Sequence, residues 1–202
     1  MGQGRYLIGI TGASGAVYGR RLVEVLLAEG HLVEVILTVA GKKVVGHELG
    51  IRLDQADDAG QEGELLREAF GPARFYSVDD LFTPPASGSV AYDGLAIAPC
   101  SMGTLAAVAT GASANLLQRA ADVALKEGWP LVLVPRETPL NKAHLRNLLT
   151  AAELGARIVP AMPAFYHHPQ SVEELVDFVV GRVLRALGLE QTFVPPWGEQ
   201  FC

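Results

Sequence analysis

The stretch Arg5-Tyr-Leu-Ile-Gly-Ile-Thr-Gly-Ala-Ser-Gly-Ala-Val-Tyr-Gly19 decides the fold of this 202-residue chain. The apolar run Leu7–Ile10 is too short for a helix and fits a buried strand. Small, hydroxyl-bearing residues follow at Thr11–Gly15, and from Ala16 apolar residues recur at steps of three and four. We expect this helix to end near Gly30, because glycine readily takes the left-handed conformation that stops a helix. The chain therefore opens with a strand, a glycine-rich turn and a helix.

This opening turn has two interpretations. The geometry points backbone N–H groups and the positive end of a helix dipole at whatever lies above the sheet, which favours an anion or cofactor. However, Gly9, Gly12 and Gly15 give G-x-x-G-x-x-G, which differs from the G-x-G-x-x-G of dinucleotide sites, and there is no P-loop pattern. A tight turn that needs glycine only for backbone room remains the alternative, so later motifs must decide.

The rest of the chain alternates between strand and helix patterns. Further strands are predicted at 31–38, 93–100, 130–135 and 156–159, an acidic surface loop at 54–63, and helices at 41–49, 64–70, 105–110, 115–127, 141–154 and 171–187. The last helix should begin with a capping box at Ser171–Glu174. This alternation predicts one α/β domain over residues 1–202, with a doubly wound, mainly parallel sheet of the Rossmann or flavodoxin-like kind.

A second strand–turn–helix unit, at 93–110, repeats the opening one and makes a ligand cradle at the shared sheet edge more probable. Neutral hydroxyls and amides suit flavin mononucleotide (FMN), whose phosphate needs donors and whose ring needs a flat slot. Arg136 follows a strand and can pair with a phosphate in a bidentate fork, although an exposed ion pair with its neighbour is the alternative. The polar residues expected at strand ends are Ser14, Thr38, Ser101, Thr104, Arg136 and Glu137.

Composition excludes several classes of function. The net charge of −6 argues against non-specific binding to nucleic acid. Residues 94–118 carry no charge, but Pro99 and several glycines interrupt them, so we expect a buried strand–turn–helix and no membrane span. The two cysteines, Cys100 and Cys202, are too few for a disulfide framework, and the chain enters a strand without a signal peptide, which indicates the cytoplasm. Half of the residues are hydrophobic, which hints at surface buried between subunits.

Several other residues allow both a functional and an ordinary structural interpretation. Arg119 and Lys126 are seven residues apart and share a helix face, which could simply be solvated. Tyr166 and Arg182 could be a packed aromatic and a surface cation. His167 and His168 resemble a metal pair, but adjacent side chains diverge and no third ligand is evident, so no metal is predicted. Cys100 is expected to pack as a small buried residue.

The motifs of the chain, taken together and in order, resemble the UbiX-type flavin prenyltransferases. The resemblance covers nearly the whole chain, with Thr38 where many relatives have serine and Val39 where lysine is common. The motifs that carry it are Thr11–Gly15, Pro85–Ser89, Pro99–Thr104, Arg119–Asp122 with Lys126, Pro135–Pro139, Phe165–His168 and Trp197–Glu199.

This resemblance implies a specific reaction. Members of the family join the five-carbon unit of dimethylallyl phosphate to reduced FMN, through bonds at flavin N5 and C6, without a metal. The product, prenyl-FMN, would serve a UbiD-type decarboxylase. The resemblance also implies a homododecamer with sites between subunits, and a tail at 189–202 that packs on the active site or on a neighbouring subunit.

The resemblance further implies roles for individual residues. The flavin-contact positions are Gly12, Ala13, Ser14, Thr38, Ser101, Met102, Gly103, Thr104, Arg119 and Arg136. The phosphate of the prenyl donor would contact Lys126, Arg136, Glu137, Tyr166 and Arg182, whose three cations could replace a metal clamp. The catalytic positions are Ser14, Glu48, Lys126, Glu137, Tyr166 and Trp197, and the two aromatic rings among them could face a developing allylic cation.

Three alternatives stay open at this point. An FMN-dependent decarboxylase of cysteine-type substrates would bind flavin similarly but would not need the phosphate-binding cations with Tyr166. A flavodoxin-like electron carrier would not need Pro135–Pro139 or the aromatic tail. An aromatic-acid decarboxylase acting directly would need a decarboxylation centre, which nothing in the sequence provides apart from the flavin product.

Overall fold

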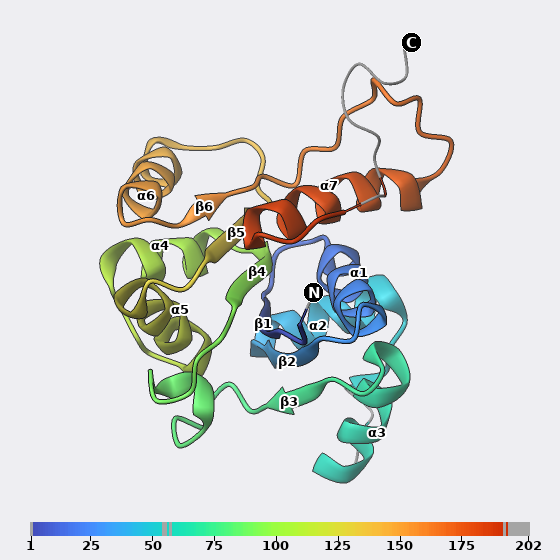
Figure 1. The fold of residues 1–202 in the computed structure, drawn as a ribbon, viewed down its shortest axis with the longest axis vertical. Coiled ribbons are helices and arrows are strands. Elements are labelled where there is room, and N and C mark those ends of the chain that lie inside the picture. The colour runs from blue at the N-terminus through green and yellow to red at the C-terminus, as the bar shows by residue number, and fades with distance from the viewer. Residues whose placement is uncertain (1, 54–55, 57, 192, 194–202) are drawn as a thin grey trace.

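The computed structural model describes residues 2–53, 56, 58–191 and 193. This part of the chain forms a six-stranded sheet in the order β3-β2-β1-β4-β5-β6, and all of its neighbouring strands are parallel (Figure 1). The strands are β1 (Arg5–Ile10), β2 (Leu32–Leu37), β3 (Arg74–Tyr76), β4 (Gly94–Cys100), β5 (Leu131–Pro135) and β6 (Arg157–Ile158).

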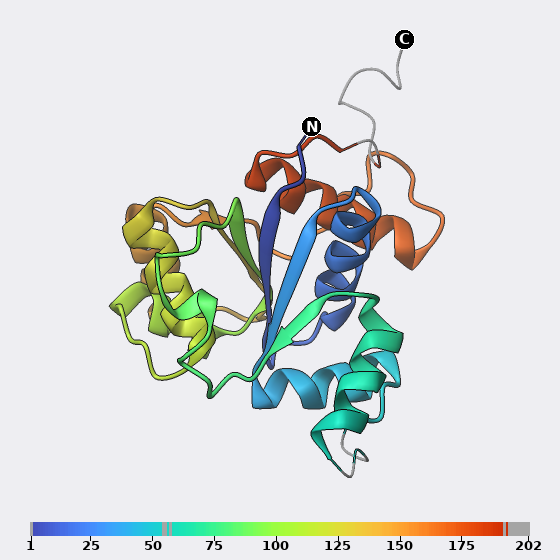
Figure 2. The same cartoon turned by 60° about the horizontal axis from the view of Figure 1, so that its bottom comes forward.

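Helices cover both faces of this sheet, as Figure 2 shows. Buried side chains of α1, α2, α3 and α7 form the core on one face, and those of α4, α5 and α6 form it on the other. The prediction of a single, doubly wound α/β domain is therefore confirmed. The helices are α1 (Ala16–Ala28), α2 (Val39–Leu49), α3 (Ala59–Phe70), the 3-10 helix η2 (Pro84–Ala86), α4 (Met102–Thr110), α5 (Leu116–Glu127), α6 (Lys142–Glu153) and α7 (Val172–Leu187).

The strand order places the topological switch point, where a crevice is expected, between β1 and β4. The connection after β1 leads to β2 on one side, whereas the connection after β4 leads to β5 on the other. In open α/β sheets such a switch point opens a crevice at the carboxyl ends of the strands. Gly9 keeps this centre compact, because a Cβ atom there would lie 2.4 Å from Leu117 Cδ1 on α5.

Three elements differ from the prediction. Helix α4 begins at Met102, three residues before the predicted start, because the Ser101 hydroxyl accepts a hydrogen bond from the Thr104 N–H and caps its first turn. Helix α3 begins at Ala59, inside the predicted loop, because the Asp58 carboxylate accepts a hydrogen bond from the Gln61 N–H at 2.9 Å and caps the first turn. Gly60 and Gly63 have low helix propensity, so the sequence pattern does not predict that the helix begins this early. The edge strand β3 was not predicted, since its three residues are too few for a recognisable alternation.

The capping box predicted for α7 is only partly formed. The Ser171 hydroxyl accepts from the Glu174 N–H at 3.2 Å, but the Glu174 carboxylate accepts from the N–H of Gln170, one residue earlier than expected. In the part of the chain with described structure, no helix is long and apolar enough to cross a membrane.

Candidate active site

Thr11 joins the two turns that flank the crevice. It follows β1 directly and is almost completely buried. Its hydroxyl donates to the Pro99 carbonyl at 2.7 Å and accepts from the Ser101 N–H at 2.8 Å, so it fixes the β4–α4 turn against the β1–α1 turn. Sequence reasoning did not include Thr11 among the site residues. The available signal was a lone hydroxyl directly after a buried apolar strand.

Glu48 closes the amino end of α1. Its Oε2 accepts from the backbone N–H groups of Gly15 and Ala16, both at 2.8 Å. Burial raises the pKa of this carboxyl, but hydrogen bonds from Ser14 and the two amides, with the charge of Arg136, outweigh it and hold the pKa below the ordinary 4.5. An internal carboxylate therefore occupies the helix terminus that sequence analysis offered to a ligand anion.

The amino end of α4, unlike that of α1, offers neutral hydrogen-bond donors. Ser101 caps this helix by accepting from the Thr104 N–H at 3.3 Å, and the two hydroxyls lie 3.1 Å apart. A Cβ atom at Gly103 would meet nothing within 4 Å, so the backbone of the first turn is accessible. Neutral donors at a positive helix end fit a phosphate group, and these residues therefore fit the phosphate of FMN.

The β1–α1 turn and the first turn of α2 approach each other closely on the other side of the crevice. A Cβ atom at Gly12 would lie 2.5 Å from the Ala40 Cβ, so only glycine fits there. The Thr38 hydroxyl accepts from the Gly41 N–H at 3.0 Å and caps α2. Gly12, Ala13, Ser14 and Thr38 thus follow the carboxyl ends of the neighbouring strands β1 and β2, on one side of the switch point.

Arg136 connects the end of β5 with both turns. Its Nε donates to the Ser14 carbonyl at 3.1 Å, and its backbone N–H donates to the Cys100 carbonyl at 3.3 Å. The sequence pattern predicts this reach into the crevice. Glu137 lies next to it at the exposed strand end, where its carboxylate accepts from the Thr138 N–H at 3.0 Å. One cation and one carboxylate therefore border the crevice at the end of β5.

Tyr166 and Arg182 belong to a separate group on α7 and the loop before it. The Tyr166 ring meets the Phe178 ring edge-on, with 5.9 Å between centroids, and Arg182 is exposed one turn further along the same face of α7. The start of this loop is fixed to the crevice, because the Ala161 N–H donates to the Pro135 carbonyl at 3.1 Å.

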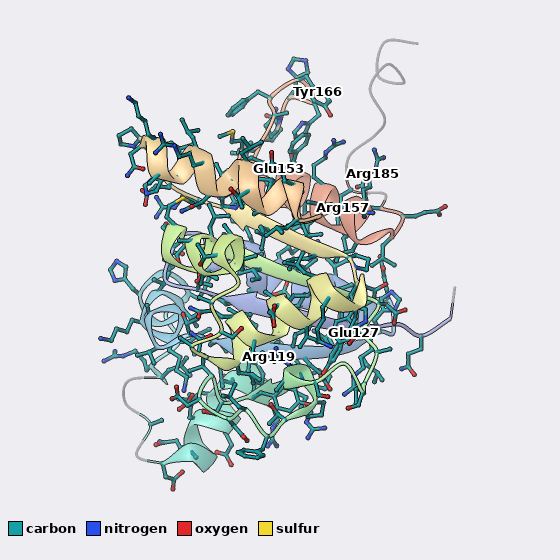
Figure 3. The ribbon with its side chains drawn as sticks, turned by 90° about the vertical axis from the view of Figure 1, so that its left-hand side faces the viewer. Arg119, Glu127, Glu153, Arg157, Tyr166 and Arg185 are labelled. Carbon is teal, nitrogen blue, oxygen red and sulfur yellow. The ribbon has the colours of Figure 1, made fainter. Side chains whose placement is uncertain are left out.

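Arg119 and Lys126 lie away from this group. The Arg119 Nε donates to the Ala86 carbonyl at 3.1 Å, and Lys126 pairs with Glu127. Lys126 is in the last turn of α5, which leads to the amino end of β5, whereas Arg136 follows the carboxyl end about 15 Å away along the strand. Figure 3 likewise shows Arg119 and Glu127 in the lower half of the molecule and Tyr166 near the top. One chain alone therefore does not bring Lys126 to Arg136.

Three candidates remain: Cys100 as a nucleophile, a metal site, and Trp197 in the tail. Cys100 is buried, and burial raises the pKa of its thiol to about 12, so it does not serve as a nucleophile at neutral pH. Among the described residues, no group of three His, Cys, Asp or Glu side chains could hold a metal ion. Trp197 and the tail from 194 onward lie outside the described residues.

Comparison with known proteins identifies the family. A family model described as Flavoprotein matches residues 1–184. The flavin prenyltransferase UbiX of Pseudomonas aeruginosa is 50% identical over 201 residues, which cover 98% of this chain and 96% of that protein. The chain belongs to the UbiX flavin prenyltransferase family. UbiX of Methanocaldococcus jannaschii is 42% identical over 194 residues, which cover 96% of this chain and 98% of that protein.

Solved structures agree with this UbiX assignment. AnUbiX, crystallised with FMN and dimethylallyl pyrophosphate, has a TM-score of 0.84 at 34% identity, with 98% of each chain covered. A dodecameric FMN-dependent UbiX-like decarboxylase from Escherichia coli O157:H7 has a TM-score of 0.81 at 37% identity, covering 96% of this chain and 98% of that one. The cysteine decarboxylase TvaF, at 17% identity and a TM-score of 0.59, shares only the fold.

Proposed function

We propose that this protein joins the dimethylallyl group of dimethylallyl phosphate to reduced FMN, at flavin N5 and C6, and makes prenyl-FMN without a metal. The observation that carries the proposal is the meeting of Ser14, Glu48 and Arg136 beside the open first turn of α4. The 50% sequence identity with UbiX of Pseudomonas aeruginosa, over nearly the whole chain, supports this proposal. Reduced FMN supplies the nucleophilic ring atoms, and the protein supplies binding, orientation and charge.

The flavin would lie across the crevice at the carboxyl edge. The amides of Met102 and Gly103 and the hydroxyls of Ser101 and Thr104 would hold its phosphate at the amino end of α4. Because Glu48 already occupies the amino end of α1, a phosphate there would meet a carboxylate, so the α4 end is the favoured of the two. The edge formed by Gly12, Ala13, Ser14 and Thr38 would then meet the ring.

The prenyl phosphate would be held by cations because its leaving group gains charge as the carbon–oxygen bond breaks. Arg136 and Glu137 stand at the crevice, and Tyr166 and Arg182 belong to the adjoining loop and helix. Preorganised cations stabilise such charge most effectively in a site that excludes water. The aromatic ring of Tyr166, and that of Trp197 in the tail, would face the allylic carbon.

Lys126 and Arg119 would come from a second copy of the chain. About 15 Å of β5 separate Lys126 from Arg136 within one chain, so a site that uses both needs two copies. We therefore propose a homo-oligomer with shared sites, and a dodecamer because the UbiX-like decarboxylase from Escherichia coli O157:H7 is described as one. The tail at 189–202 would pack on this site or on the neighbouring subunit.

The wider setting is also a proposal. We place the reaction in the cytoplasm and assign the product to a UbiD-type decarboxylase, because modified FMN must leave this protein to be used. The choice between monophosphate and diphosphate depends on the donor pocket. Because AnUbiX was crystallised with dimethylallyl pyrophosphate, the experiment below uses both the monophosphate and the diphosphate as donors.

Phosphate release tests this proposal directly. With dimethylallyl phosphate and reduced FMN under anaerobic conditions, the protein should release inorganic phosphate at the same rate with and without EDTA. Oxidised FMN is the matched control and should give no release. Release without any flavin would indicate a phosphatase. No release of phosphate from the monophosphate or of diphosphate from the diphosphate would contradict the prenyltransferase and direct attention to thiol substrates.

A further inference from the structure

The loop after β3 carries a stiff acidic and apolar projection, the knob Asp79–Phe82. The Phe82 side chain is fully exposed, and Leu81 is 48% exposed. Two local hydrogen bonds brace the backbone of this knob: the Asp80 carboxylate accepts from the Phe82 N–H at 2.9 Å, and the Thr83 hydroxyl donates to the Asp80 carbonyl at 2.9 Å. An exposed aromatic side chain on a backbone turn braced in this way can serve as an anchor for a protein contact.

This knob is attached to the helix that carries Arg119. The Leu116 N–H, in the first turn of α5, donates to the Val78 carbonyl at 2.8 Å, next to the knob. Arg119, one turn later, donates to the Ala86 carbonyl at 3.1 Å, just beyond the knob. Hydrogen bonds on both sides of the knob therefore join it to α5, so a partner that binds the knob lies close to Arg119.

A complementary hollow of about 550 Å³ lies along α2, called here the α2 pocket. Its apolar lining comes from Val39, which is 62% exposed, and from Leu53. Lys43 and His47 are exposed on its rim, one helical turn apart. This basic rim contrasts with a chain whose net charge is −6. The pocket begins directly after Thr38, so it adjoins the crevice.

We infer that the knob of one copy of this chain docks into the α2 pocket of a second copy. Leu81 and Phe82 would cover the apolar lining, while Asp79 would face Lys43 and His47 on the rim. The inference deepens the proposed function on which it rests, because this contact would carry Arg119 toward the neighbour's crevice. Since the two surfaces differ, the contact is heterologous and closes a ring when its rotation permits.

A charge exchange tests this contact. Asp79→Lys and Lys43→Asp should each raise the concentration at which the FMN-bound assembly half-dissociates by about tenfold, measured by sedimentation velocity. The double variant should return to within about threefold of the wild type. The two single changes move the net charge from −6 to −4 and to −8, so an effect of net charge alone would act in opposite directions.

Two further variants complete the experiment. Phe82→Ala should weaken assembly, while Glu153→Lys on α6 makes the same charge change as Asp79→Lys away from both surfaces and should assemble like the wild type. Flavin titration and thermal melting check that every variant is folded. A wild type that stays monomeric, a double variant weaker than both single ones, or a Phe82→Ala protein that assembles normally would overturn the inference.

This experiment separates the contact from the proposed reaction, because assembly is measured without a prenyl donor. If the charge exchange restores assembly but the wild type leaves FMN unmodified, only the proposed function fails. If the wild type modifies FMN while Asp79→Lys and Lys43→Asp assemble normally, only the contact fails.

Discussion

Replacing Thr11 by valine should loosen the crevice without changing its shape. Valine has nearly the same volume as threonine but lacks the hydroxyl that bonds to the Pro99 carbonyl and the Ser101 N–H. The Ser101 N–H, which is partly buried, would lose its acceptor. The Pro99 carbonyl would keep the backbone N–H of residue 11, at 3.3 Å, as a weaker partner.

The size of this effect follows from those two bonds. A buried donor left without an acceptor costs about 1–3 kcal/mol, and we take the partly buried Ser101 N–H at the middle of this range, about 2 kcal/mol. The lost bond to Pro99 adds about 1 kcal/mol, and the extra buried methyl group of valine returns about 0.8 kcal/mol. The free energy of unfolding should therefore fall by roughly 2 kcal/mol, or about 4–8 °C in Tm for a chain of this length.

Calorimetry at fixed protein concentration, without flavin, measures this loss. Thr11→Ser is the matched control, because serine keeps both hydrogen bonds and loses only a methyl group, at a cost of about 0.8 kcal/mol. The affinity for FMN should fall with Thr11→Val, since the α4 end is no longer fixed against the β1–α1 turn. A valine variant as stable as the serine variant would refute the reasoning.

Three other predictions concern single side chains. Glu48→Gln should lower the free energy of unfolding at pH 7 by about 1 kcal/mol. Because the folded-state pKa of Glu48 lies below 4.5, this difference from the wild type should vanish as the pH falls through that pKa. Urea titrations that give the same difference at every pH would contradict this prediction. Tyr166→Phe and Arg182→Ala should bind FMN normally in fluorescence titrations but lose phosphate release; lost flavin binding would remove them from the donor site. Cys100 should resist iodoacetamide at pH 8 in peptide mass analysis, and rapid alkylation of the native protein would contradict its burial.

The pattern of apolar residues was sufficient to predict most of the fold. Buried parallel strands such as β4 are uniformly apolar, and α5 and α7 carry clear stripes and caps, so their positions followed from local rules. The edge strand β3 and the start of α3 were missed because a three-residue strand and a glycine-containing first turn leave little periodicity. Local signals therefore sufficed wherever an element was long and packed on one face.

The candidate site was less predictable because its contacts are tertiary. Glu48 bonds to Gly15, 33 residues earlier, and Thr11 bonds to Ser101, 90 residues later, so no spacing rule joins them. The helical period places Arg119 and Lys126 on one face of α5. The period does not show, however, that α5 ends near the amino end of β5, far from Arg136 at the carboxyl end. The family resemblance supplied their expected roles, and the structure adds that one chain alone does not bring Lys126 to Arg136.

The mass of the flavin after one anaerobic turnover shows whether this protein transfers a prenyl group. Reduced FMN, limiting protein and deuterium-labelled dimethylallyl phosphate are mixed with EDTA, and the flavin is released and weighed. We expect FMN that is heavier by one labelled five-carbon unit, and unmodified FMN with Tyr166→Phe. Unmodified FMN from the wild type, bound but unchanged with either the monophosphate or the diphosphate, would contradict this expectation.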